Sequence, residues 1–580
     1  MSGEPLIIVV GGNALALRVC AELRGTQGHR VALLWTHDRE IAARLERLGV
    51  EYVARAPNDY DALRAAGIAG AVSIMTLDED DRLNLQVALK ARDLNPDIRL
   101  VIRQFTRRLG RKIEQNLPNC SVLSLASHAA ATYAASALDR ACFYAFEFPD
   151  NADGVVAGFS RRSASELGVA GLSVAQAQER LQCRVVGVGV GGKDHAAAGR
   201  TIHPDEEVVI FGRLSALEAA APETFPEARK GRPPSLRVFI AQVRSVIRAM
   251  RQLDPIVQRI AIGAGVLYVL SVIYFAYALH KDWLTSLYFV NSTVTTVGYG
   301  DITPLKAGRG AMLVANGIMF AGVALSGIFV AVMTTALTRA QWVAMQGLRR
   351  IHTRGHFVVC GTGNVGTRVI DYLLAQNKRL VVIDHAPATA TIELSRDRVL
   401  ELLTGDATSD TTLDHCNLKH ARAIITLTDS DTSNLEVALG ARARNPKLPV
   451  VMRIQDDTFA QSVARQFGFT EAYSTAALSA PVFAGLSRFA GSRGRIAFGG
   501  DEYNIGERQQ GEVPSPPPAE NCIPLGVWRK GAFHQIDAFD EVEPFDRLLF
   551  IVPLSQFRVP PPTAPSAAPE SLTASLVKEK

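Results

Sequence analysis

The chain is poor in cysteine and has no cluster of metal-binding side chains. Its 580 residues include seven cysteines, which are scattered: Cys20, Cys120, Cys142, Cys183, Cys360, Cys416 and Cys522. None of them forms a C-x-x-C pair, and the histidines do not follow the spacing of a metal site. This usage argues against a disulfide scaffold and against a zinc site, and is typical of isolated thiols in reduced cytosolic domains.

Other familiar signals are also missing. The N-terminus enters an apolar run at Leu6 without a basic segment or a cleavage site, so we expect no signal peptide and a cytoplasmic N-terminal domain. No apolar segment carries arginine at every third position, which leaves voltage sensing unsupported. The net charge of +5 is modest for this length, and we expect no nucleic-acid partner.

Long uncharged runs, by contrast, are present. Residues 260–279 and 310–338 contain no charged side chain, and the second run is bracketed by Arg309 and Arg339. About 20 apolar residues match one membrane crossing, although either run alone could be a buried core helix. An apolar content of 48% in a chain too long for one core predicts a small membrane part and large soluble parts.

Basic residues flank these runs on their outer sides. Upstream lie Arg229, Lys230, Arg232, Arg237, Arg244, Arg248, Arg251 and Arg259, and downstream lie Arg339, Arg349, Arg350 and Arg354. Cytoplasmic loops are enriched in such residues, so we expect a multi-pass protein of the cell (inner) membrane with both termini cytoplasmic. The stretch 236–258 mixes apolar residues with arginine and predicts either an interfacial helix or an extension of the first span.

The segment between the two runs contains the most informative motif, Thr295-Thr296-Val297-Gly298-Tyr299-Gly300-Asp301. Carbonyls that point the same way along a pore require backbone conformations that glycine adopts easily. T-V-G-Y-G is the signature of potassium filters, in which carbonyl rings replace the water shell of the ion. The motif predicts K⁺ coordination by Thr296, Val297, Gly298 and Tyr299, below a short re-entrant helix at 283–295 whose C-terminal dipole faces the cation.

Residues 260–338 therefore resemble the two-span potassium channels, with outer helix, pore helix, filter and inner helix in order. The resemblance implies a homotetramer in a lipid bilayer, with Thr295 and Asp301 supporting the filter. Ser292 occupies the position where the family sometimes has an acid. Gly322 matches a gating hinge of the family, but the alternative is that Gly317, Gly322 and Gly327 simply allow close helix packing.

An internal repeat flanks this pore segment. The stretch 6–19 aligns with 356–369, Asn84 corresponds to Asn434, and Asn95-Pro96 to Asn445-Pro446. Each copy alternates apolar strands with helical stretches, which predicts βαβ units and a parallel sheet.

The second copy contains a complete G-x-G-x-x-G: Gly361, Thr362, Gly363, Asn364, Val365 and Gly366. Asp384 closes the next strand, near the spacing of about 20 at which an acid binds ribose hydroxyls. These residues, together with Asp406, predict a site for NAD(H) or an adenine nucleotide as regulatory ligand. The first copy has Asn13, Ala16 and Trp35 at the matching positions, which predicts a retained fold with lost or altered ligand preference.

Both copies, each with a smaller β-rich unit behind it, resemble the regulator of potassium conductance (RCK, TrkA-N/TrkA-C-like) domain. The expected fold is multidomain: an α-helical two-transmembrane pore module plus two α/β Rossmann-like RCK domains, each with a small α+β C-lobe. The expected bounds are 1–145 and 146–220 for the first RCK lobes, 221–258 for a basic linker, 259–338 for the pore, 339–353 for a linker, 354–480 and 481–556 for the second RCK lobes, and 557–580 for a disordered tail.

The resemblance implies a ligand-gated potassium channel and no enzymatic activity. One RCK-like unit before the pore and one after it departs from the usual order, in which both follow the pore. Two alternatives remain open at this point. One is a regulatory or uptake component of a K⁺ transport system, and the other is a membrane-anchored NAD-dependent oxidoreductase, for which His356, His385, His415 and His420 are available but in no catalytic motif.

Overall fold

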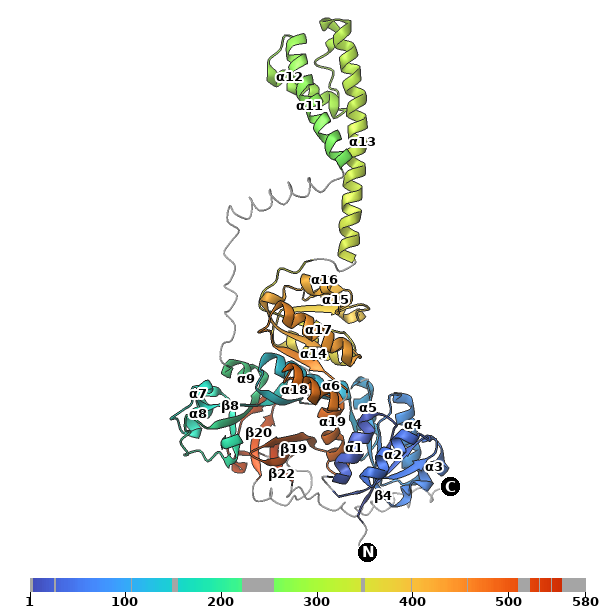
Figure 1. Ribbon diagram of the computed structural model, residues 1–580, viewed down its shortest axis with the longest axis vertical. Helices are drawn as coiled ribbons and strands as arrows, with labels where there is room; N and C mark the ends of the chain where they lie inside the picture. The colour runs from blue at the N-terminus through green and yellow to red at the C-terminus, as the bar shows by residue number, and fades with distance from the viewer. Residues whose placement is uncertain are drawn as a thin grey trace, which may run out of the picture. The chain divides into compact units, whose positions relative to one another are not determined.

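The computed structural model describes most of the chain in two units: residues 4–25, 28–105, 107–148, 155–221, 255–345, 350–397, 399–455, 457–509, 522–530, 532–543 and 545–554. One unit combines the two ends of the chain, and the other, 227–349, contains the predicted membrane segment (Figure 1). Residues 236–254 of the predicted interfacial helix, residues 346–349 of the predicted 339–353 linker and the predicted tail at 557–580 lie outside the described residues. Residues 255–258 belong to the helix α11 (Pro255–Ala278), and residues 339–345 belong to the helix α13 (Arg309–Met345).

The unit made of the two chain ends has a first half, residues 1–226, and a second half, residues 350–580. The first half begins with a parallel sheet in the order β3-β2-β1-β4-β5-β6. This order is the one typical of doubly wound nucleotide-binding folds. The strands are β1 (Leu6–Val10), β2 (Arg30–Trp35), β3 (Glu51–Ala54), β4 (Ala71–Thr76), β5 (Arg99–Arg103) and β6 (Cys120–Leu123). The helices between them are α1 (Ala14–Gly25), α2 (Arg39–Leu48), α3 (Tyr60–Ala65), α4 (Asp81–Leu94) and α5 (Arg107–Asn116).

The second half repeats this arrangement as β14-β13-β12-β15-β16-β17. Its strands are β12 (His356–Cys360), β13 (Leu380–Asp384), β14 (Glu401–Thr404), β15 (Ala421–Thr426), β16 (Val450–Arg453) and β17 (Ala472–Tyr473). Its helices are α14 (Asn364–Ala375), α15 (Thr389–Arg396), α16 (Asp410–His415), α17 (Asp431–Arg444) and α18 (Asp457–Phe467). The predicted βαβ repeat is confirmed.

A buried asparagine performs the same task in both copies. Asn84 accepts a hydrogen bond from the Asp78 amide at 2.9 Å and donates to the Asp78 and Arg103 carbonyls. Asn434 makes the equivalent bonds to Thr428 and Arg453. Because a buried amide side chain must satisfy its donors and acceptor, each asparagine joins the ends of two neighbouring strands.

Each half ends in a smaller antiparallel sheet, as the sequence predicts. The first contains β7 (Cys142–Glu147), β8 (Val156–Ser163), β9 (Arg184–Gly189), β10 (Asp194–His195) and β11 (Glu207–Arg213), with α7 (Ala164–Leu167), α8 (Val174–Leu181) and α9 (Leu214–Ala220). The second contains β18 (Ser492–Phe498), β19 (Asp501–Gln509), β20 (Ile523–Arg529), β21 (Ala532–His534) and β22 (Arg547–Pro553). The two sheets share an aromatic core that includes Phe146, Phe159, Phe211 and Phe498.

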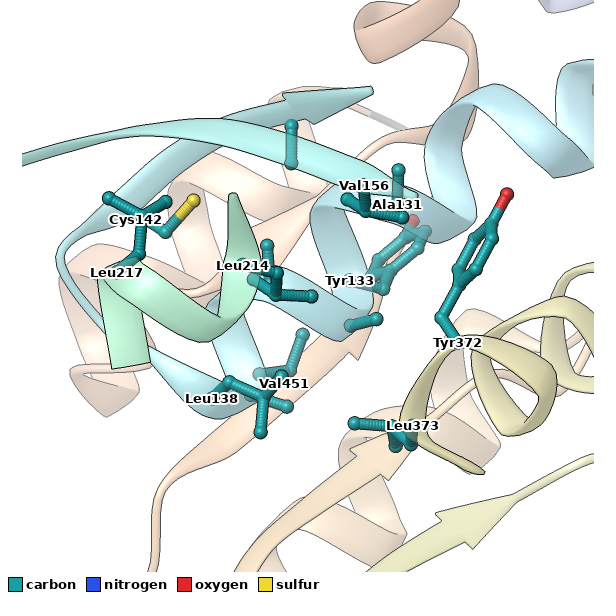
Figure 2. Packing of buried hydrophobic residues seen from close by; sticks show 14 of the residues in the cluster. Ala131, Tyr133, Leu138, Cys142, Val156, Leu214, Leu217, Tyr372, Leu373 and Val451 are labelled. Carbon is teal, nitrogen blue, oxygen red and sulfur yellow. The ribbon is translucent and has the colours of Figure 1, made fainter. Parts of the chain in front are cut away.

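Two helices are exchanged between the halves. The helix α6 (Leu125–Leu138) follows the first sheet, yet it packs on α14 and on the second sheet, where Tyr133 and Leu138 lie in one core with Leu373 and Val451 (Figure 2). The helix α19 (Thr475–Leu486) follows the second sheet and packs on α1, with Phe483 in one core with Ile7. A helix that is apolar all round needs cover on every side, and this exchange provides it.

Polar contacts accompany the exchange. The Tyr133 hydroxyl donates to the Tyr473 carbonyl at 2.9 Å, and Ser136 Oγ lies 3.1 Å from the Tyr473 hydroxyl. Glu218 pairs with Lys378 at 2.6 Å and with Arg422 at 3.0 Å, again across the two halves. The two ends of the chain therefore form one folded unit.

The other unit contains α11 (Pro255–Ala278), α12 (Trp283–Val294) and α13 (Arg309–Met345), which confirms the three helices predicted there. In the described residues, Arg309–Gly327 of α13 is long and apolar enough to cross a membrane, and Ile262–Ala278 of α11 is a shorter apolar helix. The core of this unit consists of Phe275, Phe289, Val290, Ala315 and Ile318.

We expect Tyr133 to hold the exchanged helices in place. Tyr133→Ala removes a fully buried ring and should lower the free energy of unfolding by about 3–5 kcal/mol. Tyr133→Phe removes only the hydroxyl and should cost about 1 kcal/mol. Thermal unfolding of the purified chain measures both, with Tyr60→Phe as control, because the Tyr60 hydroxyl bonds Asp93 at the exposed surface. Equal midpoints for wild type and Tyr133→Ala would contradict the role of this contact.

Candidate filter and nucleotide sites

The candidate filter begins where α12 ends. Asp282 caps the start of α12 by accepting hydrogen bonds from the Thr285 amide and hydroxyl, and Thr295 lies at its C-cap. This arrangement follows from the sequence, since aspartate is a preferred N-cap residue. The short helix predicted at 283–295 is confirmed as α12, and its re-entrant position in the membrane stays a prediction.

The filter backbone has the conformations that the motif predicts at its glycines. Gly298 and Gly300 have φ of 55° and 78°, in the left-handed region where a Cβ is disfavoured. Thr296 also has a positive φ, of 63°. Such conformations persist where the surrounding structure enforces them and are common at functional sites.

Ser292 and Asp301 contact the filter region in different ways. The Ser292 carbonyl accepts a hydrogen bond from the Gly298 amide at 3.0 Å, whereas its hydroxyl bonds back to Phe289 within α12. Asp301 is hydrogen-bonded to the Tyr288 hydroxyl. The Tyr288 and Tyr299 rings stack with centroids 6.3 Å apart. Tyr288, which the sequence did not mark, thus connects α12 to the C-terminal end of the motif.

Gly322 of α13 lies against the end of α12. A Cβ built on Gly322 would lie 2.7 Å from the Val294 carbonyl oxygen and 3.0 Å from the Val294 Cα. The same construction at Gly317 and Gly327 meets nothing within 4 Å. Of the two interpretations of Gly322, this contact supports close packing, and the hinge stays a prediction.

The candidate nucleotide site lies at the turn between β12 and α14. Gly361 has a φ of 99°. A Cβ on Gly366 would lie 2.0 Å from the Gly361 carbonyl oxygen, so only glycine fits at that position. Gly363 is the N-cap of α14, with no side-chain cap and with open space where its Cβ would be. Its helix N-terminus therefore presents backbone amides of the kind that bind phosphate.

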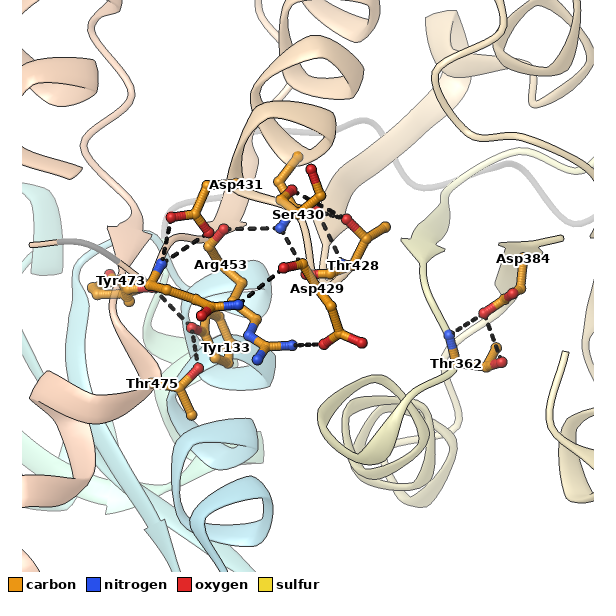
Figure 3. Close-up of polar contacts among 12 residues, drawn as sticks. Tyr133, Thr362, Asp384, Thr428, Asp429, Ser430, Asp431, Arg453, Tyr473 and Thr475 are labelled. Carbon is orange, nitrogen blue, oxygen red and sulfur yellow. Dashed lines mark hydrogen bonds and ion pairs between the residues drawn. The ribbon is translucent and has the colours of Figure 1, made fainter. Parts of the chain in front are cut away.

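Asp384 at the end of β13 holds this turn. Its Oδ2 accepts hydrogen bonds from the Thr362 amide at 2.5 Å and from the Thr362 hydroxyl at 2.8 Å (Figure 3). Its Oδ1 accepts from the Ala386 amide at 2.8 Å. Burial alone would raise the pKa of Asp384, but these hydrogen bonds outweigh it and hold the pKa below its ordinary value. The carboxylate is thus held in its ionised form.

The other predicted residues lie around the same strand ends. Asn364 and Val365 open α14, and Val365 is buried. Asp406 follows β14, where its Oδ1 accepts from the Thr408 amide and hydroxyl, which lowers the pKa of Asp406. The Gly405 amide donates to the Asp384 carbonyl at 3.0 Å, which brings the Asp406 loop beside Asp384.

Sequence reasoning did not assign two neighbours to this site. The loop after β15 packs on the turn, since a Cβ on Gly361 would lie 3.1 Å from the Thr428 amide nitrogen. The exposed His385 ring lies with Nδ1 3.4 Å from the Asp384 carboxylate. The repeat marked the loop as part of the fold, but nothing in it showed that the loop touches the glycine turn. In the described residues there is no group of histidine, cysteine or acidic side chains that could hold a metal ion.

Comparisons with known families fit this geometry. Residues 7–117 and 357–475 match the TrkA-N domain, and residues 262–339 match an ion channel domain. The chain therefore carries TrkA-N domains on both sides of an ion channel domain, which confirms the predicted resemblance and the fold class and makes it a membrane protein.

Individual relatives are distant. Potassium channel protein 1 of Methanocaldococcus jannaschii is 27% identical over 30% of this chain and 53% of its own length. The voltage-gated potassium channel Kch of Escherichia coli is 26% identical over 30% of this chain and 43% of its own length. The chain thus spans about half the length of these curated relatives, or less. Among solved structures, the GsuK channel aligns with a TM-score of 0.49 at 13% identity, over 95% of this chain and 77% of that one.

Substitutions in α13 test the packing of Gly322. Gly322→Ala places a methyl group against the Val294 backbone and should lower the stability of the pore unit by about 1–3 kcal/mol. In Gly317→Ala the new methyl group lies in open space, so the stability of the pore unit should stay unchanged or rise by up to about 1 kcal/mol. Thermal unfolding in detergent compares the two variants. If they were equally stable, close packing would not explain the glycine at 322.

Proposed function

We propose that this chain forms a potassium-selective channel whose opening is controlled by a nucleotide bound at the second TrkA-N domain. The observation that carries the proposal is the run Thr296 to Gly300, placed between the end of α12 and the start of α13 with left-handed glycines at 298 and 300. Relatives named as potassium channels support it, as does the matching ion channel domain.

Conduction requires several copies of the chain. In potassium filters, carbonyls from four copies surround each ion, which is why we propose a homotetramer with K⁺ held by Thr296, Val297, Gly298 and Tyr299. The exposure of the motif supports this, because the single chain leaves the side chains of Val297 and Tyr299 exposed by 53% and 71%. Neighbouring copies would cover such apolar surface.

The proposed regulatory ligand is NAD(H) or an adenine nucleotide. The open N-terminus of α14 suits a pyrophosphate, and the ionised Asp384 suits the two hydroxyls of a free ribose. A nucleotide that binds one state of the TrkA-N pair more tightly shifts the pore equilibrium by that difference in affinity. Residues 346–353, which follow α13, would carry the shift to that helix.

The proposed topology places the TrkA-N domains in the cytoplasm. The basic residues that flank the two apolar runs support it, since cytoplasmic flanks carry the excess of lysine and arginine. A role as regulatory or uptake component remains the second candidate, because part of the chain is 28% identical to a Trk system potassium uptake protein TrkA homolog of Pyrococcus abyssi. A filter within the same chain favours the channel.

Potassium flux from liposomes tests the function. We expect the purified chain to pass K⁺ in preference to Na⁺, and NAD⁺, NADH, ADP or ATP, added singly, to change the rate. Gly298→Ala should abolish the selective flux, because a Cβ at that φ costs about 1–2 kcal/mol and displaces the filter carbonyls. No flux from intact protein under any nucleotide would contradict the channel and favour the uptake component.

Asp384→Ala separates gating from conduction. The variant should keep K⁺ selectivity but bind the active nucleotide about tenfold or more weakly, since hydrogen bonds to a charged group contribute about 1.5–3 kcal/mol. Asp414→Ala is the matched control, because Asp414 is an exposed acid of the same domain that pairs with Arg444. An unchanged nucleotide response in Asp384→Ala would rule out this aspartate as the ribose ligand.

A further inference from the structure

The first TrkA-N domain has the same strand framework as the second, so its altered residues can be compared position by position. Trp35 ends β2 beside Ala54, as Asp384 ends β13 beside Thr404. Trp35 therefore stands where the second domain has its ribose-binding acid. By the same register, Ala56 stands in the place of Asp406.

The N-terminus of α1 is occupied by the chain's own side chain. Asn13 Oδ1 accepts a hydrogen bond from the Ala16 amide at 3.0 Å, and Asn13 Nδ2 donates to the Leu77 carbonyl at 2.7 Å. The corresponding residue in the second domain is Gly363, which has no side chain to cap α14. An amide oxygen thus takes the position at the helix start that a phosphate oxygen would take.

The Trp35 ring covers the turn that precedes α1. A Cβ built on Gly12 would lie 2.2 Å from Trp35 Nε1 and 2.6 Å from two ring carbons. The ring also packs against the core formed by β1, α1 and α19. An indole offers a donor but no acceptor for ribose hydroxyls, and it fills space beside the glycine turn.

Ala16 changes the shape of the turn itself. In the second domain a Cβ at the matching Gly366 would lie 2.0 Å from the Gly361 carbonyl oxygen. Ala16 is fully buried, and the turn at Gly11 has a φ of 141°, against 99° at Gly361. The first turn therefore follows a different path, because the tight approach of the second one leaves no room for a methyl group.

From these contacts we propose that the first TrkA-N domain keeps its nucleotide site filled with its own side chains, Asn13 and Trp35, and that each chain binds a single nucleotide, at the second domain. This inference rests on the proposed nucleotide binding and gives its stoichiometry. The first domain then packs against the second without binding nucleotide itself, and its conformation does not depend on nucleotide concentration.

Equilibrium dialysis of the purified full-length chain against labelled NAD⁺, NADH, ADP or ATP gives the number of sites. We expect one nucleotide per chain. Gly363→Asn copies the Asn13 cap into the second domain, where a Cβ meets open space, and should remove all nucleotide binding without a loss of thermal stability. Two nucleotides per chain, or one that persists in folded Gly363→Asn, would overturn the proposal.

A second measurement does not depend on any nucleotide. Gly12→Ala should lower the thermal midpoint by several degrees, because the methyl group collides with the Trp35 ring. In a Trp35→Ala background the same substitution should lower the thermal midpoint much less. An equal decrease in both backgrounds would show that the ring does not fill the turn, and would overturn the proposal. If the wild-type chain binds none of the nucleotides, the proposed gating is contradicted. The comparison of Gly12→Ala in the two backgrounds still decides whether the Trp35 ring fills the first site.

Discussion

Each parallel sheet of this chain depends on a helix from the opposite half for part of its cover. Helices α6 and α19 are rich in alanine, so they approach their neighbours closely and bury many small side chains. Phe357, Val359 and Val451 of the second domain lie in one core with α6, and Ile7 and Val9 of the first lie in one core with α19. The pairing of the halves rests on this exchange.

The exchange also connects the nucleotide site to the other half. The helix α14 starts at the glycine turn and lies along α6. Close-packed interiors transmit displacements instead of absorbing them, so a shift of α14 on ligand binding has to be accommodated by α6. If Asn13 and Trp35 fill the first site as proposed, the first half would offer the second a surface that does not change with nucleotide concentration.

Much of this could be predicted from local patterns. The filter motif, the caps and the glycine turn depend on residues close together in the chain, and the repeat fixed the register of Asp384. The exchange could not be predicted in this way, because α6 shows no polar face from which to infer a partner. The same limit applies to Trp35, whose substitution indicated a changed ligand preference but not that its ring lies on Gly12. The contact of Gly322 with Val294 likewise depends on how two helices cross.

The pairing of the two halves also constrains the segment that separates them in sequence. Their cores interpenetrate, so both halves lie in the same aqueous compartment. Any polypeptide that leaves that compartment between them must return to it, and the number of crossings between α9 and β12 is therefore even. The two spans predicted from the sequence satisfy this parity, independently of the charged residues that flank them. It also means that the first half completes its fold only after the second has been synthesised.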